Sequence, residues 1–130
     1  MAMFDQTIAT DLLALLLNDT AFSAVAATYI QLGSTIGTAT GDQTQISGTG
    51  YTTGGSSITW NSVSSAATSN SNTISWTNGG SSWSIQGLEI WNTAGSVRYL
   101  FGQFSGTLPI TVANGNTFQI AAAGVSVSLV

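Results

Sequence analysis

The last third of the chain, residues 82–130, alternates apolar and polar residues in short runs. The runs are SWSIQGLEIWNT, VRYLFGQFS, LPITVANGNTFQI and AGVSVSLV. Alternation with a period of two is typical of β-strands that bury one face. We therefore expect a series of antiparallel strands in this region. Asn114-Gly115 is its strongest hairpin signal, and Pro109 lies where a strand is expected to start.

The first two of these runs also predict which side chains face outward. One strand is expected to begin with Trp83, Ile85 and Leu88, with a bulge at Gly87. Alternation assigns the large apolar residues to the core and leaves three outward-facing groups: Glu89, Trp91 and Arg98. Glu89 and Arg98 lie on adjacent strands, so they are candidates for a cross-strand pair. An exposed pair worth roughly 0–1 kcal/mol is favoured over an ion pair in a subunit contact.

The middle of the chain contains three shorter strand-like runs. Residues 26–32 (AATYIQL) predict the first strand, and residues 57–63 (SITWNSV) and 72–77 (NTISWT) predict two more. In each of the last two runs an Ile and a Trp stand two apart, so both are expected to point inward. Residues 33–57 are rich in Gly, Ser and Thr and predict a loop, with a short strand around Tyr51. A loop of this length is often functional or ordered by a partner.

Helical periodicity is confined to the N-terminal segment, where we expect a helix over residues 3–18. Its stripe at spacings of three and four comprises Phe4, Ile8, Leu12, Leu15 and Leu16, and Leu13 and Leu17 widen the apolar surface. A helix that is apolar over most of its girth must be covered on more than one side. A signal peptide is disfavoured because the segment has no basic residue. The chain is therefore expected to stay in the producing cytoplasm until it is assembled or released.

These elements together predict a mainly β fold. About seven short strands with frequent turns are typical of an antiparallel β-sandwich or jelly-roll-like domain. We expect a single domain over residues 1–130, with the N-terminal α-helix at 3–18 and the β-sandwich at 26–130. The leucine run at 12–17 is too short to span a bilayer.

Composition excludes several function classes. The 130 residues include one cation, Arg98, against five carboxylates, and neither His nor Cys. One arginine cannot neutralise a phosphate backbone or an anionic membrane, so neither partner is expected. Without His or Cys the usual zinc sites and Ser–His or Cys–His catalysis are absent. We expect no metal, no cofactor and no enzymatic activity, and the low charge favours association between copies.

Two sites with chemistry remain as alternatives. Glu89 with Asp42 could form a glycosidase carboxylate pair, but isolated acids are more often solvated at the surface. The four tryptophans could stack on sugar rings, the alternative being core packing: Trp60, Trp76, Trp83 and Trp91. The Ile-x-Trp spacing favours the core for Trp60 and Trp76. For Trp91 an exposed position and a buried one remain equally open.

Several segments, in their order and spacing, carry a family resemblance. They are DLLALLLND, TAFSAVAATYIQLGS, GTGY, ITW, ISW, SSWSIQGLEIWNTAGS, YLFGQF, TLPITVANGNTF and AAAGVSVSLV. Through them the chain resembles a family of small tailed-bacteriophage virion proteins, labelled tail-fibre-like proteins or capsid decoration (cement) proteins. The resemblance implies a structural role in the virion, after assembly in the host cytoplasm, and no catalytic residues.

Within that family, the lack of a coiled-coil or collagen-like repeat favours a cement protein on the capsid surface. It would bind the major capsid protein and itself, as a trimer or another small homo-oligomer. The alternatives are a tail- or fibre-associated virion protein and a carbohydrate-binding receptor-recognition module. The candidate assembly interface combines helix positions with the outward groups of the last third: Phe4, Ile8, Leu12, Leu13, Leu16, Leu17, Glu89, Trp91 and Arg98.

Overall fold

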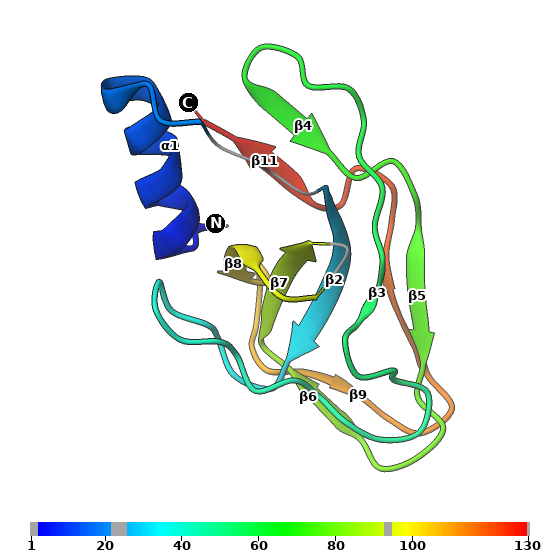
Figure 1. The fold of residues 1–130 in the computed structure, drawn as a ribbon. Helices are drawn as coiled ribbons and strands as arrows, with labels where there is room; N and C mark the ends of the chain where they lie inside the picture. The colour runs from blue at the N-terminus through cyan, green and yellow to red at the C-terminus, as the bar shows by residue number, and fades with distance from the viewer. Residues whose placement is uncertain (1–2, 22–25, 93–94, 130) are drawn as a thin grey trace.

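The protein is mainly β, as predicted (Figure 1). The computed structural model describes the chain except for residues 1–2, 22–25, 93–94 and 130. The described residues form one helix and eleven strands, all in antiparallel pairs: β1 (Met3–Phe4), α1 (Gln6–Asn18), β2 (Ala27–Gly33), β3 (Ser56–Ser57), β4 (Ala67–Ser69), β5 (Ile74–Thr77), β6 (Trp83–Ile85), β7 (Gly87–Asn92), β8 (Arg98–Gln103), β9 (Ile110–Val112), β10 (Thr117–Ile120) and β11 (Ser126–Ser128).

A five-stranded sheet in the order β1-β8-β7-β2-β3 organises the molecule. One of its faces is apolar, because Ile30 pairs with Ile90 and Ile90 with Leu100. This face joins a single core cluster with residues of the two-stranded sheets β5–β10 and β6–β9, among them Trp76 and Val112. The arrangement is that of sheets packed face to face, as alternation of period two predicts.

The opposite face of the five-stranded sheet is polar. Gln31 pairs with Glu89, and Trp91 lies opposite both Tyr29 and Arg98. The long loop after β2 lies over this face: the Gln43 backbone N–H donates to Glu89 Oε1 at 2.7 Å, and Gln43 Nε2 donates to the Gln31 carbonyl at 3.1 Å. A polar layer is thus enclosed between the sheet and its own loop.

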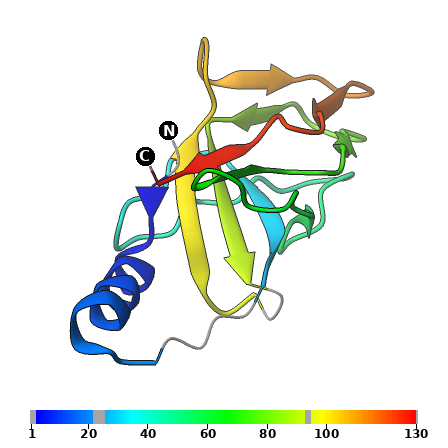
Figure 2. The same ribbon diagram turned by 90° about the horizontal axis from the view of Figure 1, so that it is seen from above.

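The helix begins three residues later than predicted. Asp5 has an extended backbone (φ −57°, ψ 147°), and its side chain caps the helix by accepting from the Thr7 N–H at 2.9 Å. Met3 and Phe4 form β1 instead, and Phe4 pairs with Leu100. In both views α1 lies beside the sheets, at one side of the molecule (Figures 1 and 2). No helix among the described residues is long and apolar enough to cross a membrane.

The single strand expected to begin with Trp83, Ile85 and Leu88 is two strands in different sheets. β6 pairs with β9, whereas β7 pairs with β2 and β8. The change of sheet occurs at Gln86, whose backbone N–H donates to the Gly33 carbonyl. Gly87 follows, where a Cβ would lie 2.6 Å from the Thr35 carbonyl oxygen. Only glycine lets the two segments approach this closely.

The turn at Asn114-Gly115 forms, but the predicted hairpin does not. Gly115 has φ 81°, and the Asn116 N–H donates to the Ala113 carbonyl at 3.1 Å. The flanking strands pair elsewhere, β9 with β6 and β10 with β5. The turn therefore connects two sheets, because each strand finds its partner in a distant segment. Pro109 directly precedes β9, as expected.

The central strands agree with the sequence in part. β2 and β5 form where predicted, and Ile74 and Trp76 are both buried. The strand expected at 57–63 is reduced to the short pairing of Ser56–Ser57 with β2, and Trp60 is half-buried. Tyr51 lies in no strand; its hydroxyl accepts from the Leu32 N–H at 3.1 Å, which fixes the long loop to the sheet.

Candidate functional site

The helix α1 exposes a row of leucines. Leu16 and Leu17 are each 76% exposed and Leu13 is 58% exposed, and Leu15 also faces solvent. These side chains lie on the last turns of the helix, away from its capped start. We call Leu13, Leu16 and Leu17 the leucine face; all three were predicted interface positions.

The apolar surface of α1 is wide as well as exposed. At about 100° per residue, its apolar positions from Ile8 to Leu17 spread over roughly 200° of the circumference. An amphipathic helix needs a stripe only about 100° wide to pack on one surface. Ile8 is buried and Leu12 half-buried, so this end packs on the body while the leucine face does not. Phe4, from β1, is half-buried against the core cluster.

A buried charge cluster anchors the start of this helix. The Arg98 side chain is only 2% exposed and all five of its N–H groups are hydrogen-bonded. Nε and Nη2 donate to Asp5 Oδ2 at 3.1 and 2.7 Å, and Nη1 donates to Glu89 Oε1 at 2.7 Å. The remaining bonds go to the Thr38 and Gly41 carbonyls, at 2.6 and 2.7 Å. The guanidinium thus links β8, β7, the helix start and the long loop.

The predicted outward position of Glu89 and Arg98 is wrong. Glu89 is fully buried, and Arg98 is nearly so. The two residues do pair across β7 and β8, as the sequence suggested, but in the interior. Glu89 Oε2 also accepts from Trp91 Nε1 at 3.1 Å, which holds the half-buried indole over the strand. Neither charged group is available to a partner, so both leave the candidate interface.

The long loop explains this reversal, because Thr38, Gly41 and Gln43 cover the face that carries Glu89. A break in alternation places Arg98 on that same face. The register between β7 and β8 shifts after Ile90, which pairs with Leu100, so that Trp91 pairs with Arg98. A strict period of two would place Arg98 on the apolar face beside Leu100. The extra residue, Tyr99, moves Arg98 to the face that carries Glu89. Its guanidinium also lies over the Phe101 ring, 5.1 Å from the centroid.

Asp5 joins the helix to the cluster through both carboxylate oxygens. Oδ1 accepts from the Thr7 N–H and Oδ2 from Arg98. Burial raises the pKa of Asp5, but the hydrogen bonds from Arg98 and Thr7 and the guanidinium charge outweigh burial, so the pKa lies below its ordinary value. Burial likewise lowers the pKa of Arg98. The hydrogen bonds to Asp5 and Glu89 raise it by more, so the pKa of Arg98 lies above its ordinary value. Both groups are held in their charged forms.

The long loop fits the cluster closely at Gly37. A Cβ there would lie 2.4 Å from Glu89 Oε1 and 2.9 Å from Arg98 Nη1. Sequence reasoning did not single out Gly37, nor Gln43, whose backbone N–H binds Glu89. No signal in the sequence marks either residue, because both contacts depend on how the long loop folds over the sheet.

Asp42 and Glu89, considered as a carboxylate pair, do meet around Arg98. Asp42 Oδ1 lies 3.5 Å from Arg98 Nη1 and its side chain is 62% exposed. Glu89 is buried, and both of its oxygens are bound by protein donors. This arrangement is an ion-pair network, with one acid at the surface and one inside.

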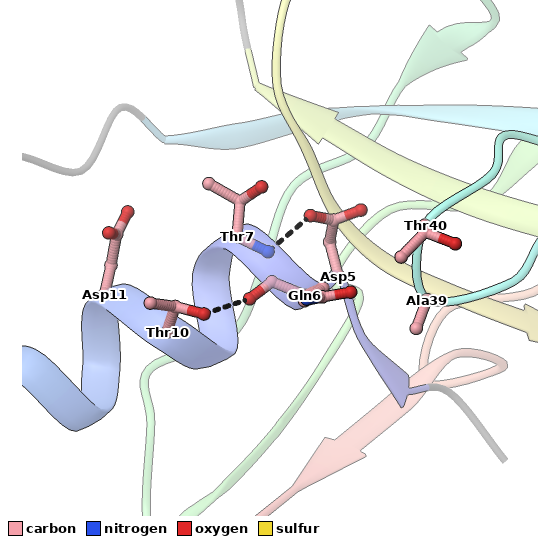
Figure 3. A pocket seen from close by; sticks show the side chains of 7 residues that line it. All are labelled: Asp5, Gln6, Thr7, Thr10, Asp11, Ala39 and Thr40. Atoms are coloured by element: carbon pink, nitrogen blue, oxygen red, sulfur yellow. Dashed lines mark hydrogen bonds between the residues drawn. The ribbon is translucent and has the colours of Figure 1, made fainter.

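A cleft lies between the first turns of α1 and the loop at Ala39–Thr40 (Figure 3). It has a volume of about 500 Å³ and contains the carboxylates of Asp5 and Asp11. Asp5 is already engaged by the Thr7 N–H, as the dashed line in Figure 3 shows. Among the described residues no group of three or more His, Cys, Asp or Glu side chains could hold a metal ion.

The tryptophans do not form an exposed platform. Trp76 and Trp83 are buried in the core, and Trp60 and Trp91 are half-buried. No described Trp, Tyr or Phe is fully exposed. The two coplanar exposed rings that would favour a flat sugar-binding surface are therefore missing from the described part of the chain.

Comparison with known proteins supports a virion protein. A protein-family model described as podophage GP4 fiber I protein gp80 matches residues 3–128. The match spans α1, the buried cluster and every sheet. A search of curated proteins found no match.

Proposed function

We propose, from the fact that the chain belongs to the family of podophage GP4 fiber I protein gp80, that it is a fibre-associated subunit attached through helix α1. Family membership makes it a structural protein of a phage virion. The observation that carries the mode of attachment is the leucine face, which stands exposed on a helix whose start is rigidly anchored. Apolar side chains exposed in such a row mark an interaction surface.

The width of the apolar arc favours more than one neighbour. A stripe about 200° wide is fully covered only when the helix is packed on two sides, as in a bundle of three helices. A second and third copy of the chain supply this most simply, because the exposed side chains of this face are leucines and carry no charge that would select a charged partner. We therefore favour a small ring, such as a trimer, with α1 at its axis.

Size-exclusion chromatography with light scattering tests this arrangement. The wild-type chain is expected to form a small oligomer, and Leu16→Gln with Leu17→Gln is expected to yield monomers that remain folded. The matched control is Val63→Gln, another exposed apolar position that lies outside the helix. If the wild-type chain is a stable monomer, the leucine face does not mediate self-association, and attachment to another virion protein takes its place.

A capsid-decorating (cement) role is the second candidate. It is favoured by the lack of any shaft-forming repeat in the sequence. Helix α1 does not supply a shaft either, because its 13 residues extend only about 20 Å at 1.5 Å per residue. Gold labelling of an epitope-tagged chain in intact particles separates the two candidates. Label at the tail supports the fibre role, whereas label over the capsid lattice replaces it with decoration of the major capsid protein.

A further inference from the structure

A second, smaller cleft opens on the polar face of the five-stranded sheet. It has a volume of about 340 Å³, and its lining includes Gln31 and Trp91 from the sheet and Asp42, Gln43 and Gln45 from the long loop. This volume is near the lower end of the roughly 300–1,000 Å³ of small-molecule sites. Such sites are mostly apolar with a few polar groups, and the lining of this cleft likewise combines apolar surface with side-chain amides and carboxylates. A small ligand that carries both apolar faces and hydroxyl groups fits that lining best.

Gln31 brings an unpaired side-chain amide to the cleft. The residue is 5% exposed and lines the cleft, yet its side-chain amide makes no hydrogen bond to any described residue. The amide is not one of the buried side-chain groups that lack a partner, which among the described residues are Gln43 Oε1, Trp76 Nε1 and Trp83 Nε1, so its atoms reach the solvent of the cleft. An amide oxygen and an amide NH₂ therefore stand at the cleft with donor and acceptor capacity unused.

Gln45 and Trp91, which also line the cleft, are held in place by hydrogen bonds within the protein. Gln45 Oε1 accepts from the Tyr51 hydroxyl and from the Gly54 N–H, at 3.2 and 3.0 Å, which leaves its NH₂ group for a ligand. The Trp91 indole forms one wall, and its Nε1 is fixed to Glu89 at 3.1 Å. The cleft thus combines an oriented aromatic ring with donors and acceptors whose positions are set by the protein, so binding need not order them first.

Charge narrows the class of ligand. The carboxylate of Glu89 is already paired with Arg98, and Asp42 lies at the surface near the same guanidinium. With every N–H of Arg98 engaged, the described lining offers no free cation for an anionic ligand. Hydroxyl groups, which both donate and accept, match the mixed amides of Gln31 and Gln45.

We propose that this cleft binds one neutral sugar residue, with a C–H face of the ring against Trp91 and its hydroxyls paired with Gln31 and Gln45. The site is a recessed pocket with one indole, in contrast to a flat platform of exposed rings. It is separate from the leucine face of α1, so sugar binding does not depend on attachment through the helix.

Saturation-transfer NMR with a panel of neutral hexoses and N-acetylhexosamines tests the proposal. At least one sugar is expected to bind wild-type protein, and Gln31→Met is expected to weaken binding about tenfold, the equivalent of one lost hydrogen bond. The control is Gln103→Met, the same change at an exposed position of β8 outside the cleft, which is expected to bind like wild type. Thermal unfolding checks the fold of both variants, and Gln31→Met should be about as stable as wild type because the side-chain amide of Gln31 forms no hydrogen bond with the described residues.

Three results would overturn the proposal. The first is that no neutral sugar of the panel binds the wild-type chain. The second is that the Gln31→Met and Gln103→Met variants bind equally well. The third is that an acidic sugar binds in preference to every neutral one, which the absence of a free cation in the described lining forbids.

Discussion

The end of helix α1 and the polar face of the five-stranded sheet are opposites in chemistry and in environment. On the helix, Leu16 and Leu17 stand in solvent; in the sheet, Glu89 and Arg98 lie in the interior. Folding normally buries the first kind of side chain and leaves the second kind exposed. Under the proposed attachment through α1, the two regions serve different purposes, one completed within the chain and the other completed by a partner.

The buried cluster is complete within the chain because each of its charges has partners. Arg98 uses all five N–H groups, and Glu89 accepts from three donors. A buried pair of this kind adds little net stability compared with apolar packing, but removing one member is strongly destabilising. Its role is positional, because it fixes where Asp5 begins the helix. The leucine face, by contrast, lies in solvent and adds little to the folding of a single chain.

The largest expected effect comes from removing the cation. In Arg98→Met the carboxylate of Glu89 stays buried without its partner, which is expected to lower the free energy of unfolding by about 3–5 kcal/mol. Urea denaturation measures this loss. Adding Glu89→Gln to Arg98→Met should recover part of it, since the buried charge is then removed. If Arg98→Met alone is as stable as wild type, the cluster contributes nothing to the stability of the fold.

A smaller loss is expected from crowding the cluster. The Cβ of Gly37→Ala would lie 2.4 Å from Glu89 Oε1, and overpacking of this kind costs about 1–3 kcal/mol. The matched control is Gly80→Ala, where the nearest atom to the new Cβ is Thr49 Oγ1 at an ordinary 3.5 Å. Denaturant midpoints should separate the two variants. Equal midpoints would mean that the loop can move away from the cluster freely.

Acid should weaken the link between helix and cluster. The pKa of Asp5 is lower in the folded chain than its ordinary value of 3.8, so the unfolded chain takes up this proton at a higher pH. The stabilisation is therefore complete above about pH 4 and is lost as pH falls through the folded pKa.

The comparison with Asp5→Asn isolates this contribution. Asparagine can still cap the helix but cannot pair with Arg98 as an anion, so the stability difference from wild type should be largest at neutral pH and shrink in acid. Asp11→Asn on the same helix is the control, because Asp11 makes no ion pair among the described residues. A difference that does not change with pH would exclude Asp5 as the titrating group.

Alternation predicted the fold class because core positions obey it locally. Ile74 and Trp76 face inward as their spacing requires, and β2 forms where its apolar run lies. Partner choice was not predictable in the same way. Both strands that flank Asn114-Gly115 pair with distant segments, β5 and β6, and such pairings depend on contacts across the whole chain.

The candidate site was predictable for the helix and not for the sheet. The leucine positions follow from helical periodicity, since 3.6 residues per turn places Leu13, Leu16 and Leu17 without reference to the rest of the fold. Alternation placed Glu89 and Arg98 on one face, and they do pair there. It could not show that the long loop covers this face, because the contacts of Thr38, Gly41 and Gln43 with the sheet join segments far apart in the chain.

The smallest expected change in stability is at the leucine face, and it is the sharpest test of the contrast. Leu17→Gln replaces a side chain that is 76% exposed, so the unfolding free energy of the isolated subunit should change by no more than about 0.5 kcal/mol. Measured in the assembled state, the same substitution should lower the melting temperature, because association stabilises the folded form by mass action. Dilution separates the two contributions: the difference from wild type should vanish as the oligomer dissociates. A loss of stability that persists in the dilute monomer would mean that the leucine face packs within its own chain, and the division of roles between helix and sheet would then be wrong.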